Sequence, residues 1–313
     1  MAAINEKNIF QIRNLHCAYK KNGKFGRTVL HIEKLDIERG KIIVLLGKSG
    51  AGKSTILETL GLMNNTANEA KNTQNKKLQL AFMPEKNKGK QFDIAKLWQA
   101  NKQAELSEIR NEYLSFIFQN TNLMPNFTAY ENICITQMLQ NVSQEEAVAH
   151  AKKMMKAIDL GEVDEEKQAH ELSGGQRQRI AFVRAITPRF SILFGDEPTG
   201  NLDEITSNIL MNMLTQNIKG NKNNQRTAII VTHNIDLALK YADQIILITK
   251  PDVPEDTEQN FGSILSQNHF YKLAETEWEY QEEGRRKNIN KEALKKQIIQ
   301  LISSKKILEK LAL

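Results

Sequence analysis

The sequence predicts an α/β fold in which helices cover a mostly parallel sheet. Three apolar runs, "KIIVLL" (41–46), "FSILFGDE" (190–197) and "RTAIIVTHN" (226–234), have the composition of strands buried on both faces. A helical pattern at 55–63 follows the first run, and another at 203–218 separates the other two. This order of strand, helix and strand indicates a parallel sheet.

The chain is expected to divide into a main domain over residues 1–250 and a C-terminal extension over residues 251–313. Residues 9–46 are predicted to form short strands and turns that end in the first buried strand. Residues 105–186 are mostly helical in pattern and interrupt the alternation, which predicts a separate helical subdomain. Residues 64–90 are polar and repetitive, so we expect an inserted, mobile loop there with one strand in "LQLAFM".

Helical patterns fill residues 95–113 and 144–160, and a third helix is expected to begin at Ser173. Ser173 can accept a hydrogen bond from the first turn, and Gln176, three residues on, is a capping-box partner. Apolar residues then recur on one face of this helix at Ile180, Val183 and Ile186. Two glycines directly after Ser173 leave backbone donors exposed, and the local pattern gives no reason for them.

Composition excludes several classes of protein. Hydrophobic residues make up 40% and charged residues 26% of the 313 residues, which is typical of a globular protein. The N-terminus lacks the pattern of a signal peptide, and no run approaches the roughly 20 apolar residues of a membrane span. Cys17 and Cys134 lack metal-binding spacing, which indicates reduced interior thiols in a cytoplasmic protein.

The net charge of +6 is unevenly distributed. Residues 285–313 contain nine Lys or Arg and two Glu, a net +7, which leaves −1 for the rest of the chain. Residues 255–283 contain eight acidic residues and one Lys, a net −7. The basic charge is therefore local, and no nucleic-acid partner is expected.

The segment "GKSGAGKST" (Gly47–Thr55) has the spacing of a phosphate-binding loop between a buried strand and a helix. Its glycines allow successive backbone N–H groups to face phosphate oxygens, and the helix N-terminus adds its dipole. Lys53 is expected to reach the β- and γ-phosphates and Ser54 to coordinate Mg²⁺. The predicted nucleotide-binding residues of this loop are Gly47, Ser49, Gly50, Gly52, Lys53, Ser54 and Thr55.

Polar residues follow three predicted strands, where a parallel sheet gathers its ligands. Asp196 is expected to hold Mg²⁺, usually through water, and the adjacent Glu197 to polarise the attacking water. His233, at the end of "VTH", is a candidate hydrogen-bond donor to the γ-phosphate. Gln119, after "FIF", is a candidate contact for both metal and water.

Taken together, these segments resemble the ATP-binding cassette (ABC) ATPases over about residues 9–250. The resemblance includes the phosphate loop, Gln119, the signature "LSGGQ" at Leu172–Gln176, the Asp196–Glu197 pair, "GNLD" ending at Asp203, and His233. Tyr19, in "LHCAYKKNGK", matches the aromatic residue that stacks on adenine in this family. The implied fold is a P-loop NTPase domain with a RecA-like parallel-sheet core, a small antiparallel β subdomain and an α-helical subdomain, to which this chain adds a helical C-terminal extension.

The resemblance also implies a mechanism in which two copies of the chain close head to tail around two ATP molecules. Ser173, Gly174, Gly175 and Gln176 would then contact the ATP bound to the other copy. Glu197 would be the catalytic acid, with Lys53, His233 and Gln119 assisting.

The finer resemblance is to the group that serves lipoprotein release, macrolide-type export and cell division, carried by "FIFQNTNLMPNFTAYENI", "DEPTGNLD" and "LSEIRNEYL". It implies a separate integral-membrane subunit, docked in a groove formed by Gln119 and the helical region 120–142. It further implies a cytoplasmic location, peripheral on the inner face of the cell membrane. Export or handling of lipoproteins or other periplasmic substrates by force transmission is the expected function.

Two other functions stay open at this stage. An ATPase that controls cell-wall hydrolases mechanically, without transport, would have the same cassette. A soluble ABC ATPase acting on nucleic acid or ribosomes is less well supported, because no long coiled coil and no second cassette are found.

Three features depart from the family pattern: the long 64–90 region, "KPDVPED" in place of a glycine turn after "QIILIT", and the C-terminal extension. The extension ends in an amphipathic, basic helix with apolar residues at Leu294, Ile298, Leu301 and Leu308. Residues 285–313 are expected to pack on the cassette or the second copy, to dock on an anionic membrane surface, or to bind a regulatory partner.

Overall fold

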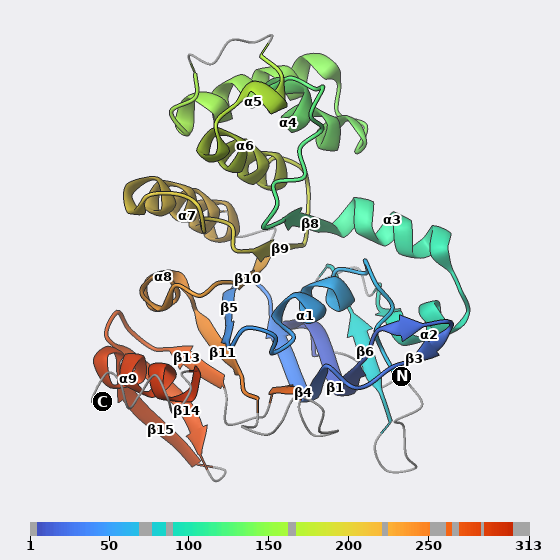
Figure 1. Cartoon of the computed structure of the whole chain (residues 1–313), viewed down its shortest axis with the longest axis vertical. Coiled ribbons are helices and arrows are strands. Elements are labelled where there is room, and N and C mark those ends of the chain that lie inside the picture. Colours follow the sequence, from blue (N-terminus) through green and yellow to red (C-terminus); the bar gives the residue numbers. More distant parts are fainter. Residues whose placement is uncertain are drawn as a thin grey trace. The chain divides into compact units, whose positions relative to one another are not determined.

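The chain forms two compact units in the computed structural model, unit 1 from Met1–Gln103 and Val231–Leu313, and unit 2 from Ala104–Ile230 (Figure 1). The structure describes residues 5–68, 77–85, 90–161, 167–220, 225–250, 261–264, 269–282 and 285–302. Residues 69–76 and 86–89 of the predicted 64–90 loop, the "KPDVPED" turn after its first residue, and Leu308 lie outside these described residues.

A mostly antiparallel sheet forms one part of unit 1, with strand order β12-β4-β1-β6-β7, in which only the β12–β4 pair among the described strands is parallel. Strand β1 pairs antiparallel with both β4 and β6, and alternate residues of β1 and β4 are buried. The predicted strand in "LQLAFM" is β6. The strands are β1 (Asn8–Cys17), β4 (Leu30–Glu38), β6 (Gln79–Phe82), β7 (Phe92–Asp93) and β12 (Gly262–Ile264), and a short hairpin of β2 (Lys20–Lys21) and β3 (Lys24–Phe25) follows β1.

A second set of strands in unit 1 has the order β15-β14-β13-β11-β5. Strands β5 (Ile42–Gly47) and β11 (Gln244–Ile248) are parallel, and every residue of both is buried. This explains why both read as continuous apolar runs. The helices of unit 1 are α1 (Lys53–Leu60), α2 (Ile94–Gln99), α8 (Ile235–Tyr241) and α9 (Lys291–Ile302).

The first part of the C-terminal extension contains strands that the sequence did not predict. Strand β13 (His269–Lys272) adds to β11 in antiparallel orientation, and β14 (Glu277–Glu282) and β15 (Arg285–Asn290) follow as further antiparallel strands. In β14 Trp278 is fully buried, whereas the neighbouring Glu277 is exposed and Glu279 is partly buried. The acidic strand lies beside the basic one, with Arg286 paired to Glu279 at 3.2 Å. Strand pairing therefore accounts for part of the acidic-then-basic charge pattern.

The predicted amphipathic helix is α9, and its apolar face packs within unit 1 beside α8, β14 and β15 (Figure 1). Leu294 and Ile298 are fully buried, and Lys295 Nζ lies 2.5 Å from a carboxylate oxygen of Asp236 on α8. Leu301 is 43% exposed. Packing on the cassette is thus the arrangement found for the described part of this helix.

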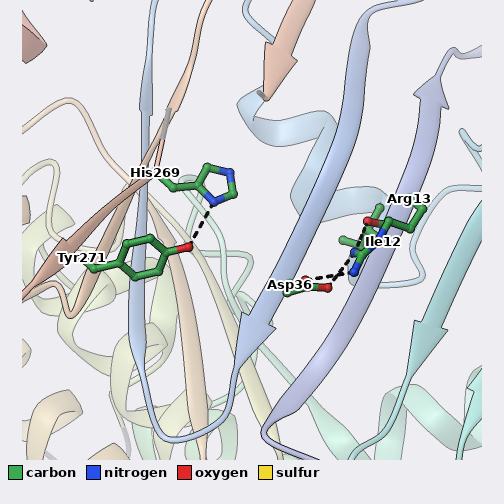
Figure 2. A network of polar contacts seen from close by, with 5 residues as sticks. All are labelled: Ile12, Arg13, Asp36, His269 and Tyr271. Atoms are coloured by element: carbon green, nitrogen blue, oxygen red, sulfur yellow. Dashed lines mark hydrogen bonds and ion pairs between the residues drawn. The ribbon is translucent and has the colours of Figure 1, made fainter. Parts of the chain in front are cut away.

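Polar side chains cluster where the extension meets the antiparallel sheet (Figure 2). Figure 2 shows the hydroxyl of Tyr271 beside Nδ1 of His269, 3.5 Å apart, and Arg13 facing Asp36, with N–O distances of 2.6 and 2.9 Å. Burial lowers the pKa of His269 to about 4, and the charge of Asp36 opposes this shift only in part. His269 is therefore neutral at pH 7.

Unit 2 contains most of the helices and three strands in the order β10-β9-β8, of which β8 and β9 are parallel. The predicted 95–113 helix is two helices, α2 and α3, because Asn101 between them has φ 51°. The elements are α3 (Gln103–Tyr113, whose first residue belongs to unit 1), β8 (Leu114–Ile117), α4 (Ala129–Met138), α5 (Gln144–Ala157), the 3₁₀ helix η2 (Ala169–Glu171), α6 (Gly174–Ile186), β9 (Ile192–Asp196), α7 (Glu204–Lys219) and β10 (Thr227–Val231, whose last residue belongs to unit 1).

Among the described residues, no helix is long and apolar enough to cross a bilayer.

Candidate nucleotide-binding site

The phosphate loop of unit 1 connects β5 to α1. Strand β5 ends at Gly47 and α1 begins at Lys53, so the loop lies between a buried strand and a helix N-terminus, as predicted. Gly50 and Gly52 have φ of 71° and 92°, a left-handed conformation that favours glycine. A Cβ at Gly52 would also lie 3.0 Å from Cβ of Leu30. The backbone conformation and the close packing therefore both favour glycine at position 52.

Lys53 is 7% exposed and its ammonium group is folded back over the loop. Nζ donates hydrogen bonds to the carbonyl oxygens of Gly47 at 2.8 Å and Lys48 at 2.9 Å. Ser49 and Ser54 are exposed. A cation enclosed by a loop with exposed hydroxyl groups, at the positive end of a helix dipole, suits a phosphate chain.

Tyr19 is joined to the first turns of α1. Its hydroxyl lies 3.1 Å from Oγ1 of Thr55 and donates to the Glu58 carboxylate at 3.1 Å, while the residue is 41% exposed. Partial burial raises the pKa of the Tyr19 hydroxyl, and the nearby Glu58 raises it further. The ring is thus held beside the phosphate loop with part of its surface available for stacking. No separate signal in the sequence pointed to Glu58.

His233 lies between β10 and α8 and is exposed. The next residue, Asn234, is the N-cap of α8 and accepts a hydrogen bond from the backbone of Leu237 at 2.9 Å. His233 is therefore presented on a short connection between a buried strand and a capped helix.

Unit 2 carries the other predicted residues. Asp196 is the last residue of β9, Glu197 follows it, and both are partly buried. Glu197 has φ 47°, an uncommon value for a residue with a side chain, and its carbonyl accepts a hydrogen bond from Gly200 N at 3.1 Å. Gln119 is exposed just after β8.

The signature segment begins α6 as the sequence predicted. Ser173 is the N-cap, its Oγ accepts from Gln176 N at 3.2 Å, and Gln176 Oε1 accepts from Ser173 N at 2.9 Å. Ser173 and Gly174 are exposed, and nothing lies within 4 Å of a Cβ built on Gly174. The first turn of this helix is therefore accessible to a ligand from outside unit 2.

Asp203 is the N-cap of α7. Its carboxylate accepts hydrogen bonds from Thr206 N at 2.9 Å and Thr206 Oγ1 at 2.7 Å, and these bonds lower the pKa of Asp203. A direct contact of Asp203 with ATP would compete with this cap.

One buried polar residue was not among the predicted site residues: Gln178, whose Nε2 donates to the carbonyl oxygens of Glu197 and Pro198 at 3.3 and 3.1 Å. It is 2% exposed, although its neighbours in the buried face of α6 are apolar. A glutamine four residues before Phe182, within an apolar stripe, is the signal that could have identified it.

The glycine loop that closes on Lys53 at the N-terminus of α1 places the chain in the class of P-loop nucleotide-binding proteins. The family model described as "ABC transporter" matches residues 30–200, which is more than half of the chain. The chain belongs to the ABC transporter family and is an ATP-binding ATPase of that family.

Relatives and solved structures agree with this assignment. The chain is 32% identical over 248 residues to the lipoprotein-releasing system ATP-binding protein LolD of Zymomonas mobilis, covering 78% of this chain and 94% of that protein. It is 34% identical over 231 residues to the LolD of Myxococcus xanthus, covering 74% and 92%.

The dimeric structure of MJ0796, described as a bacterial ABC transporter cassette, has a TM-score of 0.60 and 28% identity, covering 76% of this chain and 93% of that one. The dimeric post-hydrolysis state of MJ0796 bound to ADP and Pi has a TM-score of 0.58 and 25% identity, covering the same shares. The RecA-like core, the antiparallel β subdomain and the helical subdomain expected from the sequence are confirmed.

Proposed function

We propose that the chain is the ATP-hydrolysing subunit of a membrane ABC complex that handles lipoproteins or other substrates released at the far side of the membrane. The observation that carries this proposal is the intact phosphate loop closed around Lys53, in a chain similar over most of its length to lipoprotein-releasing ATP-binding proteins. Two copies of the chain would bind two ATP molecules between them, as the dimeric cassette structures suggest. A location on the cytoplasmic face of the membrane belongs to the same proposal.

The loop fits a nucleotide phosphate chain by its shape and charge. Lys53 and the backbone N–H groups of the loop bind the β- and γ-phosphates, and the ring of Tyr19 stacks on adenine. In exchange, Lys53 gives up its hydrogen bonds to Gly47 and Lys48.

Ser54, Gln119 and Asp196 offer hydroxyl, amide and carboxylate oxygens, the donor set that Mg²⁺ prefers. The described residues hold no cluster of three or more His, Cys, Asp or Glu, so the donors suited to this ion are these oxygens and the phosphates. Bound Mg²⁺ would neutralise charge on the phosphates.

Glu197 orients the attacking water and accepts its proton, and His233 donates a hydrogen bond to the γ-phosphate. Ser173, Gly174 and Gly175 of one copy donate to the ATP held by the Lys53 of the other. The products are ADP and phosphate, whose release lets the two copies separate and reset the membrane subunit.

A groove of about 430 Å³ in unit 2 supports docking of the membrane subunit. It is lined by residues of α3, β8, α4 and the end of α6, and includes Phe118 and Met124, whereas Gln119, which follows Phe118 in the chain, is not among its lining residues. Leu139 and Met124 are 62% and 43% exposed, whereas Arg110 and Arg184 add positive charge. An apolar segment with an acidic residue, on the cytoplasmic side of the membrane subunit, suits this surface.

The substitution Glu197→Gln tests the proposal. The amide keeps the shape of the side chain but cannot accept the proton, so ATPase turnover should fall by about a hundredfold or more. ATP binding should persist, and the variant should form an ATP-dependent dimer that does not dissociate, measured by size-exclusion chromatography with light scattering. Hydrolysis at the wild-type rate would exclude Glu197 as the catalytic residue.

A further inference from the structure

Gln178 is a buried amide in the helix that begins at the signature. It is the fifth residue of α6, whose N-cap is Ser173, and it is 2% exposed. Burying an amide costs free energy unless its polar atoms are hydrogen-bonded. The partners of Gln178 therefore indicate what the side chain does in this position.

The amide nitrogen of Gln178 holds the turn that follows β9. Nε2 donates to the carbonyl oxygen of Glu197 at 3.3 Å and to that of Pro198 at 3.1 Å. The Glu197 carbonyl also accepts from Gly200 N at 3.1 Å within the same turn. Two independent donors thus converge on the backbone of Glu197, one of them from a different element.

This backbone needs support because Glu197 has φ 47°. The left-handed conformation is strained for a residue with a side chain, and it persists only where surrounding contacts hold it. The backbone conformation at Glu197 sets the direction of its Cα–Cβ bond and so the direction of the carboxylate. A donor that fixes this backbone therefore also orients the carboxylate.

We propose that Gln178 is a positioning residue for Glu197: it holds the turn in the conformation from which the carboxylate acts on water. The inference rests on the proposed role of Glu197 in hydrolysis. Gln178 lies five positions after Ser173, which corresponds to a rise of about 7.5 Å along the helix. Because a helix is stiff over this length, the signature and the catalytic acid of one chain move together.

Gln178→Met tests the assignment, since Met keeps the length of the side chain and its helix preference but cannot donate a hydrogen bond. The full-length variant should show a kcat for ATP hydrolysis at least about tenfold lower, with KM for ATP and the Kd of a fluorescent ATP analogue within about twofold of wild type. Gln178→Leu also removes the donor and suits a helix, and if the Met variant does not fold it should likewise lower kcat while leaving KM and Kd within about twofold of wild type.

Gln137→Met is the matched control. Gln137 is 3% exposed, lies on α4 in the same unit, and has its Oε1 3.0 Å from Nδ1 of His150. Its substitution removes a buried amide of the same kind without touching the Glu197 turn. It should lower the thermal midpoint by a similar amount and leave kcat within about twofold.

A double-mutant cycle separates positioning from general loss of structure. In a Glu197→Gln background the carboxylate no longer acts, so adding Gln178→Met should reduce the residual rate by less than about twofold. An equal reduction in both backgrounds, or an unchanged kcat in Gln178→Met alone, would overturn the proposal. A separate result would contradict the proposed role of Glu197 itself. This result is ATP hydrolysis at the wild-type rate by the Glu197→Gln variant with Gln178 intact.

Discussion

At the scale of single residues, His269 shows how burial changes the chemistry of a side chain. It is 7% exposed on β13, and burial lowers its pKa from 6.5 to about 4. The unfolded chain takes up a proton on this histidine below about pH 6.5, whereas the folded chain does not until about pH 4. Protons therefore favour unfolding between these two values.

The free energy of unfolding should fall by about 2 kcal/mol between pH 7 and pH 5 through this one residue. Urea unfolding at the two pH values, followed by circular dichroism, measures the change. His269→Leu removes the titrating group and should reduce the pH dependence by that amount. A pH dependence that is the same in both proteins would show that His269 takes up its proton in the folded state.

At the scale of elements, strand β12 brings the C-terminal extension against the phosphate loop. Gly262 N donates to the carbonyl of Val29 at 2.9 Å, and β12 runs parallel to β4. A Cβ built on Gly262 would lie 1.8 Å from the carbonyl oxygen of Ala51, a residue of the loop. Position 262 can therefore hold only glycine while the loop keeps this shape.

Gly262→Ala should weaken ATP binding by about tenfold, because Ala51 must move and the N–H donors beside it lose their alignment. Ser263→Ala, the next residue of the same strand, adds no atoms toward the loop and should leave binding within about twofold. Titration with a fluorescent ATP analogue compares the two variants. If Gly262→Ala binds the ATP analogue with normal affinity and only its thermal midpoint falls, β12 has moved instead of the phosphate loop. The shape of the loop would then not depend on β12.

At the scale of the whole molecule, the predicted site residues are divided between the two units. Unit 1 carries Tyr19, the phosphate loop and His233, and unit 2 carries the other predicted residues. Ser173 and Gly174, at the first turn of α6, are exposed. The proposal that a complete site needs two copies of the chain rests on this exposed signature and on the similarity to dimeric cassette structures.

Mixing two inactive variants tests this requirement. Lys53→Ala removes the phosphate contact of one copy, and Ser173→Arg blocks the signature of the other, so each variant alone should be inactive. In the mixed dimer, the loop of the Ser173→Arg chain meets the signature of the Lys53→Ala chain, and ATPase activity should return to a measurable fraction of wild type. Ser173→Arg should also bind ATP normally as a monomer. An inactive mixture, with mixed dimers shown to form, would contradict a site shared between copies.

The residues of the phosphate loop and of the signature could be predicted from the sequence because their signals are local. A phosphate loop needs glycine and lysine at fixed spacing before a helix, and a capping box needs Ser173 and Gln176 three residues apart. Buried parallel strands such as β5 and β11 can be recognised in the sequence by their continuous apolar runs. The resemblance to ABC ATPases rested on the same short segments.

Other features depend on contacts between distant parts of the chain, which no local pattern encodes. Strands β13 to β15 form because an existing sheet edge at β11 offers them partners. The demand for glycine at 262 arises from a loop more than 200 residues earlier, and the pairing of Gln178 with Glu197 joins a helix to a turn. The chemistry of the chain can be identified from its sequence, because phosphate binding is built from adjacent backbone groups. The way those groups are held in place follows from the folded structure, because the supporting contacts come from elements that folding brings together.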